Sequence, residues 1–166
     1  MSTAHPVVVA LDPARLAELR ATGVDHGGNP VEPFVDESGE WPLRCCLTDS
    51  RVGDRIAIVA WRPFRWSGAY AEMGPVVIHA DECTGFVPGN VPSQFEARPQ
   101  IVRPYTAEHR IAYDHVRLVE EHESLTDALA DLFDHPEVDS ALVRNVTAGC
   151  LSFAVVRGDD AGLQAR

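Results

Sequence analysis

The sequence contains no lysine, so all 14 of its basic residues are arginine. This absence excludes Schiff-base chemistry on a lysine and any phosphate-binding loop of the Walker type. Acidic residues outnumber basic ones, and the net charge of −11 argues against a phosphate-backbone partner, which needs clustered basic side chains. We therefore expect no nucleic-acid binding.

Long apolar runs are also missing. No stretch approaches the roughly 20 apolar residues of a membrane span. The first ten residues lack a positively charged start, and their apolar run is too short for a secretory signal. We expect no membrane partner and a cytoplasmic, reducing location. There, the four cysteines are expected to be thiols or metal ligands rather than disulfides.

The composition suits a globular chain, with 166 residues of which 45% are hydrophobic. Predicted helices do not alternate regularly with predicted strands, which disfavours a doubly wound parallel sheet. We predict an α+β fold in one domain over residues 1–157, followed by a frayed tail over 158–166. The domain is expected to have a largely antiparallel sheet of about seven or eight strands, with two helices packed on it.

Local patterns place the elements. A helix is predicted over 13–22, because Asp12 and Pro13 form a typical start and Gly23 a typical stop. A second helix is predicted after a capping-box-like segment at Ser124, and Pro136 should end it. The strands are expected at 7–11, 43–47, 55–61, 76–79, 101–103, 110–119, 138–143 and 150–156. Long loops are expected at 24–42 and 81–99.

The segment from Gly74 to Cys83 is the most informative stretch. It predicts a short apolar strand that ends at His79, with Cys83 four residues later. Imidazole and thiolate are the side chains best suited to soft-metal binding or nucleophilic chemistry. Their place at a strand end that enters a loop also favours a functional role.

Several segments together resemble a bacterial family catalogued as domain of unknown function 1203. Its pattern includes a Gly-Pro-Ile-Phe-x-His-Ala-x-x-Cys strand, matched here by Gly74 to Cys83. Its Pro-Cys-Arg-x-Cys-Leu segment is matched by Pro42 to Leu47. Further matching stretches are 53–55, Tyr70, 102–105, 144–145 and 149–151. The resemblance covers about residues 40–157. It implies a compact single domain and no assigned activity.

The chain departs from that pattern at one position. The first cysteine of the family segment falls on Leu43 here, and Cys45 stands at a variable position. A family site that used the first thiol would therefore be altered or lost. Cys45 and Cys46 form a weak signal as a vicinal pair, because neighbouring side chains on a strand point to opposite faces.

The first hypothesis is a metal site. Tetrahedral zinc accepts a set of cysteine and histidine ligands, and zinc is the cofactor that this chain could hold. The absence of a Cys-x-x-Cys motif counts against a zinc site, because local chelation usually anchors one. The candidate ligands are Cys46, His79, Cys83 and Cys150. The alternative is that Cys46 and Cys150 lie within strands and only pack in the core.

The second hypothesis is nucleophilic catalysis. Cys83 or Cys150 would be the thiolate, and His79 would be the acid or base. Such a thiol needs a nearby cation to lower its pKa, and Arg103 and Arg144 are available in the segments that resemble the family. No known cysteine-hydrolase signature is present, so enzymatic activity stays undecided.

The third hypothesis is non-catalytic binding of a small molecule, and the overall prediction is a small-molecule site that combines the Cys/His element with anion-binding arginines. The same two arginines would hold a carboxylate or phosphate by paired hydrogen bonds. The substrate-binding candidates are Tyr70, Arg103, Tyr105, Arg144 and Asn145. The alternative is a structural or interaction domain whose cysteines only pack. His26 is expected in a flexible surface loop, and His109, His115 and His122 are expected to be solvated.

Overall fold

The computed structural model describes residues 5–158 and divides the chain into two compact units. Unit 1 comprises Met1–Val9, Phe64–Ala71 and Val87–Arg166, and unit 2 comprises Ala10–Pro63 and Glu72–Phe86. The predicted domain over 1–157 is thus organised as two units, each of which is described by itself below. Of the predicted tail, all residues after 158 lie outside the described part of the chain.

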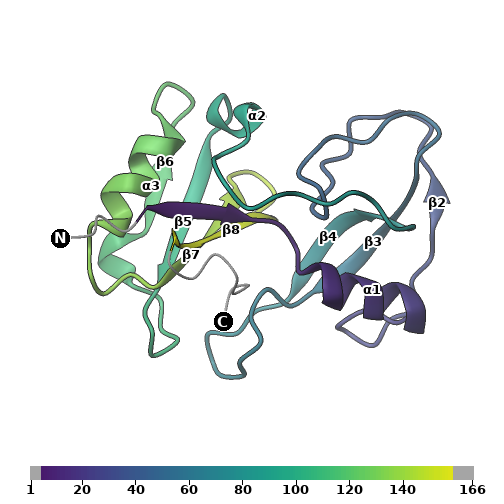
Figure 1. Ribbon diagram of the computed structural model, residues 1–166, viewed down its shortest axis with the longest axis horizontal. Helices are drawn as coiled ribbons and strands as arrows, with labels where there is room; N and C mark the ends of the chain where they lie inside the picture. The colour runs from purple at the N-terminus through teal and green to yellow at the C-terminus, as the bar shows by residue number, and fades with distance from the viewer. Residues whose placement is uncertain (1–4, 159–166) are drawn as a thin grey trace. The chain divides into compact units, whose positions relative to one another are not determined.

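Unit 1 is built on a five-stranded antiparallel sheet with the order β1-β8-β7-β5-β6 (Figure 1). Its strands are β1 (Pro6–Val9), β5 (Gln100–Tyr105), β6 (Arg117–Val119), β7 (Ser140–Asn145) and β8 (Leu151–Arg157). The two central strands β7 and β8 are almost wholly buried and consist mainly of alanine, valine, leucine and phenylalanine. A strand that is buried on both faces needs such a continuous apolar run.

The helices of unit 1 are α2 (Ser93–Glu96), the 3-10 helix η1 (Tyr113–His115) and α3 (Leu125–Phe133). The Ser124 hydroxyl caps α3 by accepting a hydrogen bond from the Asp127 amide, as the sequence predicts. The apolar face of α3 is buried through Leu125, Leu129 and Phe133. This packing, rather than helix propensity, holds so short a helix in place.

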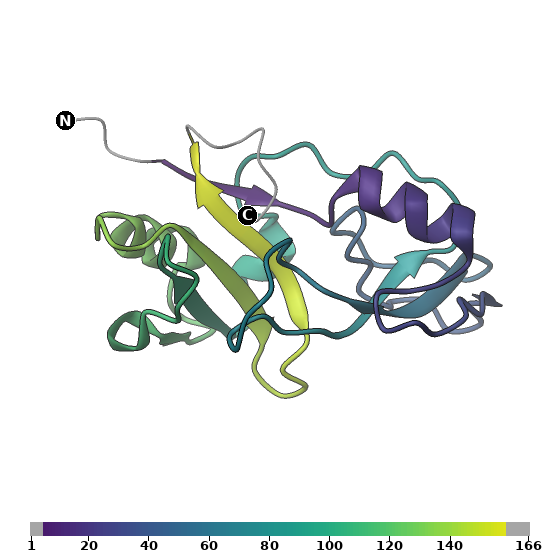
Figure 2. The same ribbon diagram turned by 90° about the horizontal axis from the view of Figure 1, so that it is seen from below.

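Unit 2 has a three-stranded antiparallel sheet with the order β2-β3-β4. Its elements are α1 (Pro13–Thr22), β2 (Phe34–Val35), β3 (Arg55–Trp61) and β4 (Gly74–His79). Figure 2 shows α1 running beside β3 and β4. The helix begins where the Asp12 carboxylate accepts hydrogen bonds from two amides, and it ends at Gly23 with a φ of 69°. The predicted bounds of α1 and β3 are confirmed.

Pairing of β3 with β4 positions the site of unit 2. The register sets Ile56 opposite His79, so the last residue of β4 lies beside the beginning of β3. The carbonyl of His79 accepts hydrogen bonds from the Arg20 Nε (3.3 Å) and Nη2 (3.0 Å). The guanidinium of Arg20, on α1, therefore fixes the end of β4 that carries the His79 side chain.

The antiparallel α+β class is confirmed, with the eight strands of the described residues divided between two sheets. Two predicted strands are wrong. Residues 43–47 form a turn, and most of 110–119 is loop and 3-10 helix, with only Arg117–Val119 in a strand. Within residues 5–158, no helix is long and apolar enough to cross a membrane.

Candidate metal and ligand site in unit 2

A tight turn in unit 2 carries both vicinal cysteines. The Leu43 amide donates to the Thr48 carbonyl (2.9 Å), and Leu47 takes a φ of 57°, which lets the chain reverse. The Arg44 amide donates to the Val77 carbonyl (2.8 Å) and thereby ties the turn to β4. Because this is a turn and not a strand, Cys45 and Cys46 do not have to point to opposite faces.

The other two site residues come from the end of β4 and the loop after it. His79 is the last residue of the strand, and Cys83 is half-buried in the loop that follows. Gly85 then turns the chain with a φ of 70°. A Cβ at this glycine would lie 4.0 Å from the Cys45 carbonyl oxygen, so this loop returns towards the turn that carries Cys45 and Cys46.

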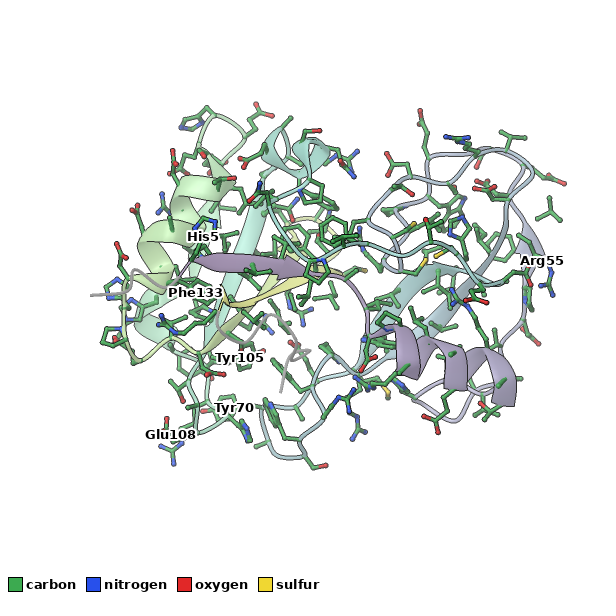
Figure 3. The ribbon with its side chains drawn as sticks, in the orientation of Figure 1. His5, Arg55, Tyr70, Tyr105, Glu108 and Phe133 are labelled. Atoms are coloured by element: carbon green, nitrogen blue, oxygen red, sulfur yellow. The ribbon has the colours of Figure 1, made fainter. Side chains whose placement is uncertain are left out.

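Three thiols and one imidazole converge at this point. The Cys45 Sγ lies 4.0 Å from the Cys46 Sγ and 3.6 Å from the His79 Nδ1. The Cys46 Sγ lies 3.8 Å from the same Nδ1. With Cys83, the four ligand atoms all lie within 4.8 Å of one another. We call these residues the Cys/His cluster. Yellow sulfur atoms are visible beside β3 and β4 in Figure 3.

Polar neighbours orient the cluster. The His79 amide donates to the Cys45 Sγ at 3.3 Å, and the Thr48 hydroxyl lies 3.0 Å from the Cys46 Sγ. On the far side of the imidazole, the His79 Nε2 lies 3.6 Å from the Asp54 Oδ2. A carboxylate near Nε2 favours the tautomer with its proton on that nitrogen, which leaves Nδ1 free to accept or to bind a metal.

The two vicinal thiols differ in acidity. The hydrogen bond that the Cys45 thiol donates lowers the pKa of Cys46 to about 5; burial opposes this effect, and the Thr48 hydroxyl and the His79 imidazole support it. The same hydrogen bond, together with burial, raises the pKa of Cys45. Of the two thiols, Cys46 therefore loses its proton more readily than Cys45.

A cavity of about 690 Å³ borders the cluster within unit 2. Cys45 and Cys83 both line it, together with Leu16 and Ala17 of α1. Charged residues also line it, among them Arg20 and residues 81–82. The Arg55 Nη1 forms an ion pair of 2.7 Å with the Asp81 Oδ1, both residues line the cavity, and Figure 3 labels the arginine. The mixed apolar and charged lining is typical of a small-molecule pocket.

The structure brings together three of the four predicted metal ligands, Cys46, His79 and Cys83. The fourth ligand atom of the cluster comes from Cys45, which sequence reasoning passed over because it assigned the turn to a strand. Cys150 belongs to unit 1, where its thiol points to the Ala148 carbonyl (3.9 Å) and is half-buried. The sequence does hold a signal for the turn that carries Cys45 and Cys46, because it is flanked by Pro42 and by Thr48-Asp49-Ser50.

The predicted anion-binding residues of β7 have structural contacts in unit 1. The Arg144 Nη1 donates to the Gly149 carbonyl at 2.8 Å. The Asn145 Oδ1 accepts hydrogen bonds from the amides of Thr147 (3.0 Å) and Ala148 (2.8 Å). Both side chains therefore shape the turn between β7 and β8, and their role in binding stays a prediction.

The remaining candidates also lie in unit 1. Tyr105 is 1% exposed and packs edge-on against Phe64 with ring centroids 4.6 Å apart. The ring centroids of Tyr70 and Tyr113 lie 6.3 Å apart. A hydrogen bond between the two side chains raises the pKa of Tyr113. Arg103 lies on β5, opposite Leu142 of β7. Figure 3 labels both Tyr70 and Tyr105.

His26 is held in place rather than loosely exposed. Its Nδ1 accepts a hydrogen bond from the Arg62 amide (2.9 Å), and its ring packs against Trp61 at 4.4 Å. Burial, followed by the charges of Arg15 and Arg62, lowers the pKa of His26. The expectation of a flexible loop is wrong here, because these contacts fix the imidazole as a structural acceptor.

Comparison with known proteins gives one result. No curated protein and no solved structure matches the chain. Residues 40–157, which include the whole Cys/His cluster, match the family described as "Protein of unknown function (DUF1203)". The match spans most of the sequence, and the chain belongs to this family.

Proposed function

We propose that unit 2 is a zinc-binding module in which Cys45, Cys46, His79 and Cys83 hold the ion beside a small-molecule pocket. The spacing of the ligand atoms carries this proposal. A tetrahedral zinc, with Zn–S of about 2.3 Å and Zn–N of about 2.0–2.1 Å, sets S···S near 3.8 Å and S···N near 3.6 Å. Among Cys45, Cys46 and His79 the separations are 4.0 Å for S···S and 3.6 and 3.8 Å for S···N, and the Cys83 sulfur lies within 4.8 Å of all three ligand atoms.

The chemistry of the donor set supports zinc in particular. Thiolates and imidazole select a soft or borderline ion, whereas magnesium and calcium prefer oxygen ligands. The two turn cysteines are buried, with exposures of 2% and 8%, and a buried thiolate is costly unless a cation neutralises it. The low pKa of Cys46 fits a ligand that binds as thiolate near neutral pH.

Surrounding groups support the same assignment. Asp54 beside the Nε2 of His79 resembles the carboxylate that commonly orients a zinc-bound histidine. The hydrogen bond from the His79 amide to the Cys45 Sγ stabilises negative charge on that sulfur. Burial also argues against Cys46 as a nucleophile, because a substrate cannot easily reach a thiol that is 8% exposed.

The pocket extends the proposal to a ligand. Its volume of about 690 Å³ falls within the range of roughly 300–1,000 Å³ that is usual for small-molecule sites. Cys83 is the half-exposed thiol of the cluster, and it lines the cavity. A molecule bound there would contact the coordination shell of the ion directly. If Cys83 yields its position to that molecule, the site becomes catalytic; if it does not, the site is structural.

The alternative is a cysteine nucleophile without metal. Cys83 at the cavity would then be the thiolate and His79 its base. The half-exposed position of Cys83 favours this alternative over one based on the buried pair. Either version needs reduced thiols, and all four cysteines, each within the described residues, are free. We therefore infer a reducing location, such as the cytoplasm, as part of this proposal.

A panel of single serine variants tests the proposal. Zinc per chain is measured after purification without a histidine tag, and affinity is measured by competition with a chromogenic chelator. We expect about one equivalent in the wild type and in Cys150→Ser, and a large loss of affinity in Cys45→Ser, Cys46→Ser and Cys83→Ser. Loss of zinc in Cys150→Ser with retention in Cys45→Ser would overturn the ligand set. A metal-free wild type with one rapidly reacting thiol would favour the nucleophile.

A further inference from the structure

A second group of side chains of the types that ligate metals lies in unit 1, far along the sequence from the Cys/His cluster. His115 ends η1, and His135 and Glu137 follow α3. The ligand atoms of these three residues lie within 4.8 Å of one another. The His115 Nε2 lies 2.8 Å from the Glu137 Oε1, and the imidazole rings of His115 and His135 lie with centroids 4.0 Å apart and planes tilted by 31°. The sequence predicts a solvated His115, but in the structure its imidazole is paired with Glu137.

We propose that His115, His135 and Glu137 form a second, more open site for a divalent transition metal of the class of Zn²⁺ or Ni²⁺. Two imidazoles with one carboxylate are a common ligand set for such ions, and imidazole disfavours Mg²⁺ and Ca²⁺. The separation of 2.8 Å between nitrogen and oxygen is close to that of two adjacent ligands on one octahedral ion, about 2.9–3.0 Å for bonds near 2.1 Å.

The backbone around two of these ligands is braced. Arg157 of β8 donates from its Nη2 to the His135 carbonyl (2.8 Å) and from its Nε to the Val138 carbonyl (2.9 Å). Its Nη1 donates to the Phe133 carbonyl (3.1 Å). One guanidinium thus fixes the loop that presents both His135 and Glu137. A fixed loop lowers the ordering cost of bringing their exposed side chains to one ion.

A hollow of about 260 Å³ adjoins the two imidazoles. His115 and His135 line it, and so do two carboxylates, Asp114 and Asp131, which favour the approach of a cation. Arg117 also lines the hollow, but its guanidinium is paired with Glu123 at 2.7 Å. Water or a small anionic ligand can complete the shell from this side.

An ion pair alone would account for only part of this arrangement. It explains the contact of His115 with Glu137, but it gives no reason for a second imidazole whose ring centroid lies only 4.0 Å from the first. A shared ion uses all three groups. Because the site lies in unit 1 and uses no cysteine, it stands or falls independently of the zinc module proposed for unit 2.

Paramagnetic Ni²⁺ tests the site without interference from that module. Nickel is titrated into the full chain, ¹⁵N-labelled, free of any tag and loaded with one equivalent of zinc. We expect selective broadening of the amide signals of Val116 and Leu132 and shifts of two imidazole resonances. His135→Ala and Glu137→Gln change exposed side chains, so both variants should fold. They should weaken nickel binding at least tenfold.

His122→Ala is the matched control, because it removes another exposed imidazole of the same unit. This variant should bind nickel as the wild type does. Broadening that is centred elsewhere, that survives unchanged in His135→Ala, or that is absent at millimolar nickel would overturn the proposal. Retained spectra of the variants in the absence of nickel would show that any loss is not due to unfolding.

Discussion

At the scale of single residues, Asp54 tests whether a carboxylate that is not itself a ligand affects metal binding by the Cys/His cluster. Its carboxylate lies 3.6 Å from the His79 Nε2 and also accepts a hydrogen bond from the Arg51 amide (2.8 Å). An asparagine keeps an acceptor for that amide but removes the negative charge beside the imidazole. The substitution therefore changes the electrostatics while leaving the turn intact.

We predict that Asp54→Asn lowers zinc affinity by roughly 10–100-fold, the usual effect of removing an outer-shell carboxylate. Chelator competition measures the change. Asp81→Asn is the control, because it removes an exposed carboxylate of the same unit that pairs with Arg55 instead. Equal zinc affinity in the two variants would show that the contact between Asp54 and His79 has no bearing on the metal.

The residue scale also shows what the sequence could reveal of the site. His79 and Cys83 were identified because they follow a clear apolar strand. Cys45 was missed because its role depends on the left-handed φ of 57° at Leu47 and on the hydrogen bond from Arg44 to β4. A positive φ at a leucine is uncommon, and pairing across about 30 residues leaves no local pattern.

At the scale of elements, the loop from Val24 to Pro30 is stabilised by one carboxylate. Asp25 accepts hydrogen bonds from the amides of Gly27 (2.9 Å), Asn29 (2.9 Å) and Ala60 (2.8 Å). Burial alone would raise the pKa of Asp25, but these hydrogen bonds outweigh it and lower the pKa. The hydrogen bond from the Ala60 amide fastens the loop to the end of β3, two residues before Arg62, whose amide holds His26.

This arrangement predicts an acid-sensitive contribution to stability. Because the folded pKa of Asp25 is lowered, its contribution is fully present above the unfolded value of about 3.9 and is lost as the pH falls through the folded value. Asp25→Asn should lower the midpoint of thermal unfolding at pH 7. The difference from the wild type should shrink as the pH approaches 3.

Glu18→Gln is the control for this experiment, since Glu18 is an exposed carboxylate on α1 of the same unit. Its unfolding midpoint should follow the wild type throughout the titration. If the difference between Asp25→Asn and the wild type stayed constant from pH 7 to pH 3, the carboxylate charge would not be the stabilising element.

Elements with strong local signals were predicted well. The helix α1 has a cap, a proline at its start and a glycine at its end, and its bounds match the prediction. In the strand β3, six consecutive apolar residues follow Arg55, and this signal is equally clear. The predicted strand over 110–119 failed because a mixed apolar and polar pattern does not distinguish a strand from the 3-10 turn that forms there.

At the scale of the whole molecule, the division into two units explains why no boundary is visible in the sequence. Each unit draws on separate segments, so the chain passes between the units at 9–10, 63–64, 71–72 and 86–87. No single linker rich in glycine or proline marks such an arrangement. The predicted antiparallel class was right because it depends on strand composition rather than on how the strands are shared between sheets.

The assignment of the cluster to unit 2 predicts an uneven response to metal removal. All four cluster residues belong to that unit, so a zinc ion there stabilises it by binding the folded state alone. Removal of zinc with a chelator should increase amide hydrogen exchange in β3, β4 and residues 42–49. Exchange in β7 and β8 should change less.

Readdition of one equivalent of zinc should restore the protection of unit 2, and magnesium should not. Cys150→Ser should respond as the wild type does, because its thiol belongs to unit 1. An equal change in both units, or no change in either, would contradict a metal site confined to unit 2.

X-ray absorption at the zinc edge tests the central claim most directly, because it reports the atoms bound to the ion. We predict a first shell of three sulfurs at about 2.3 Å and one nitrogen at about 2.0–2.1 Å, with outer-shell scattering from a single imidazole. A shell made only of nitrogen and oxygen, or one with fewer than three sulfurs, would contradict the Cys/His cluster as the zinc site.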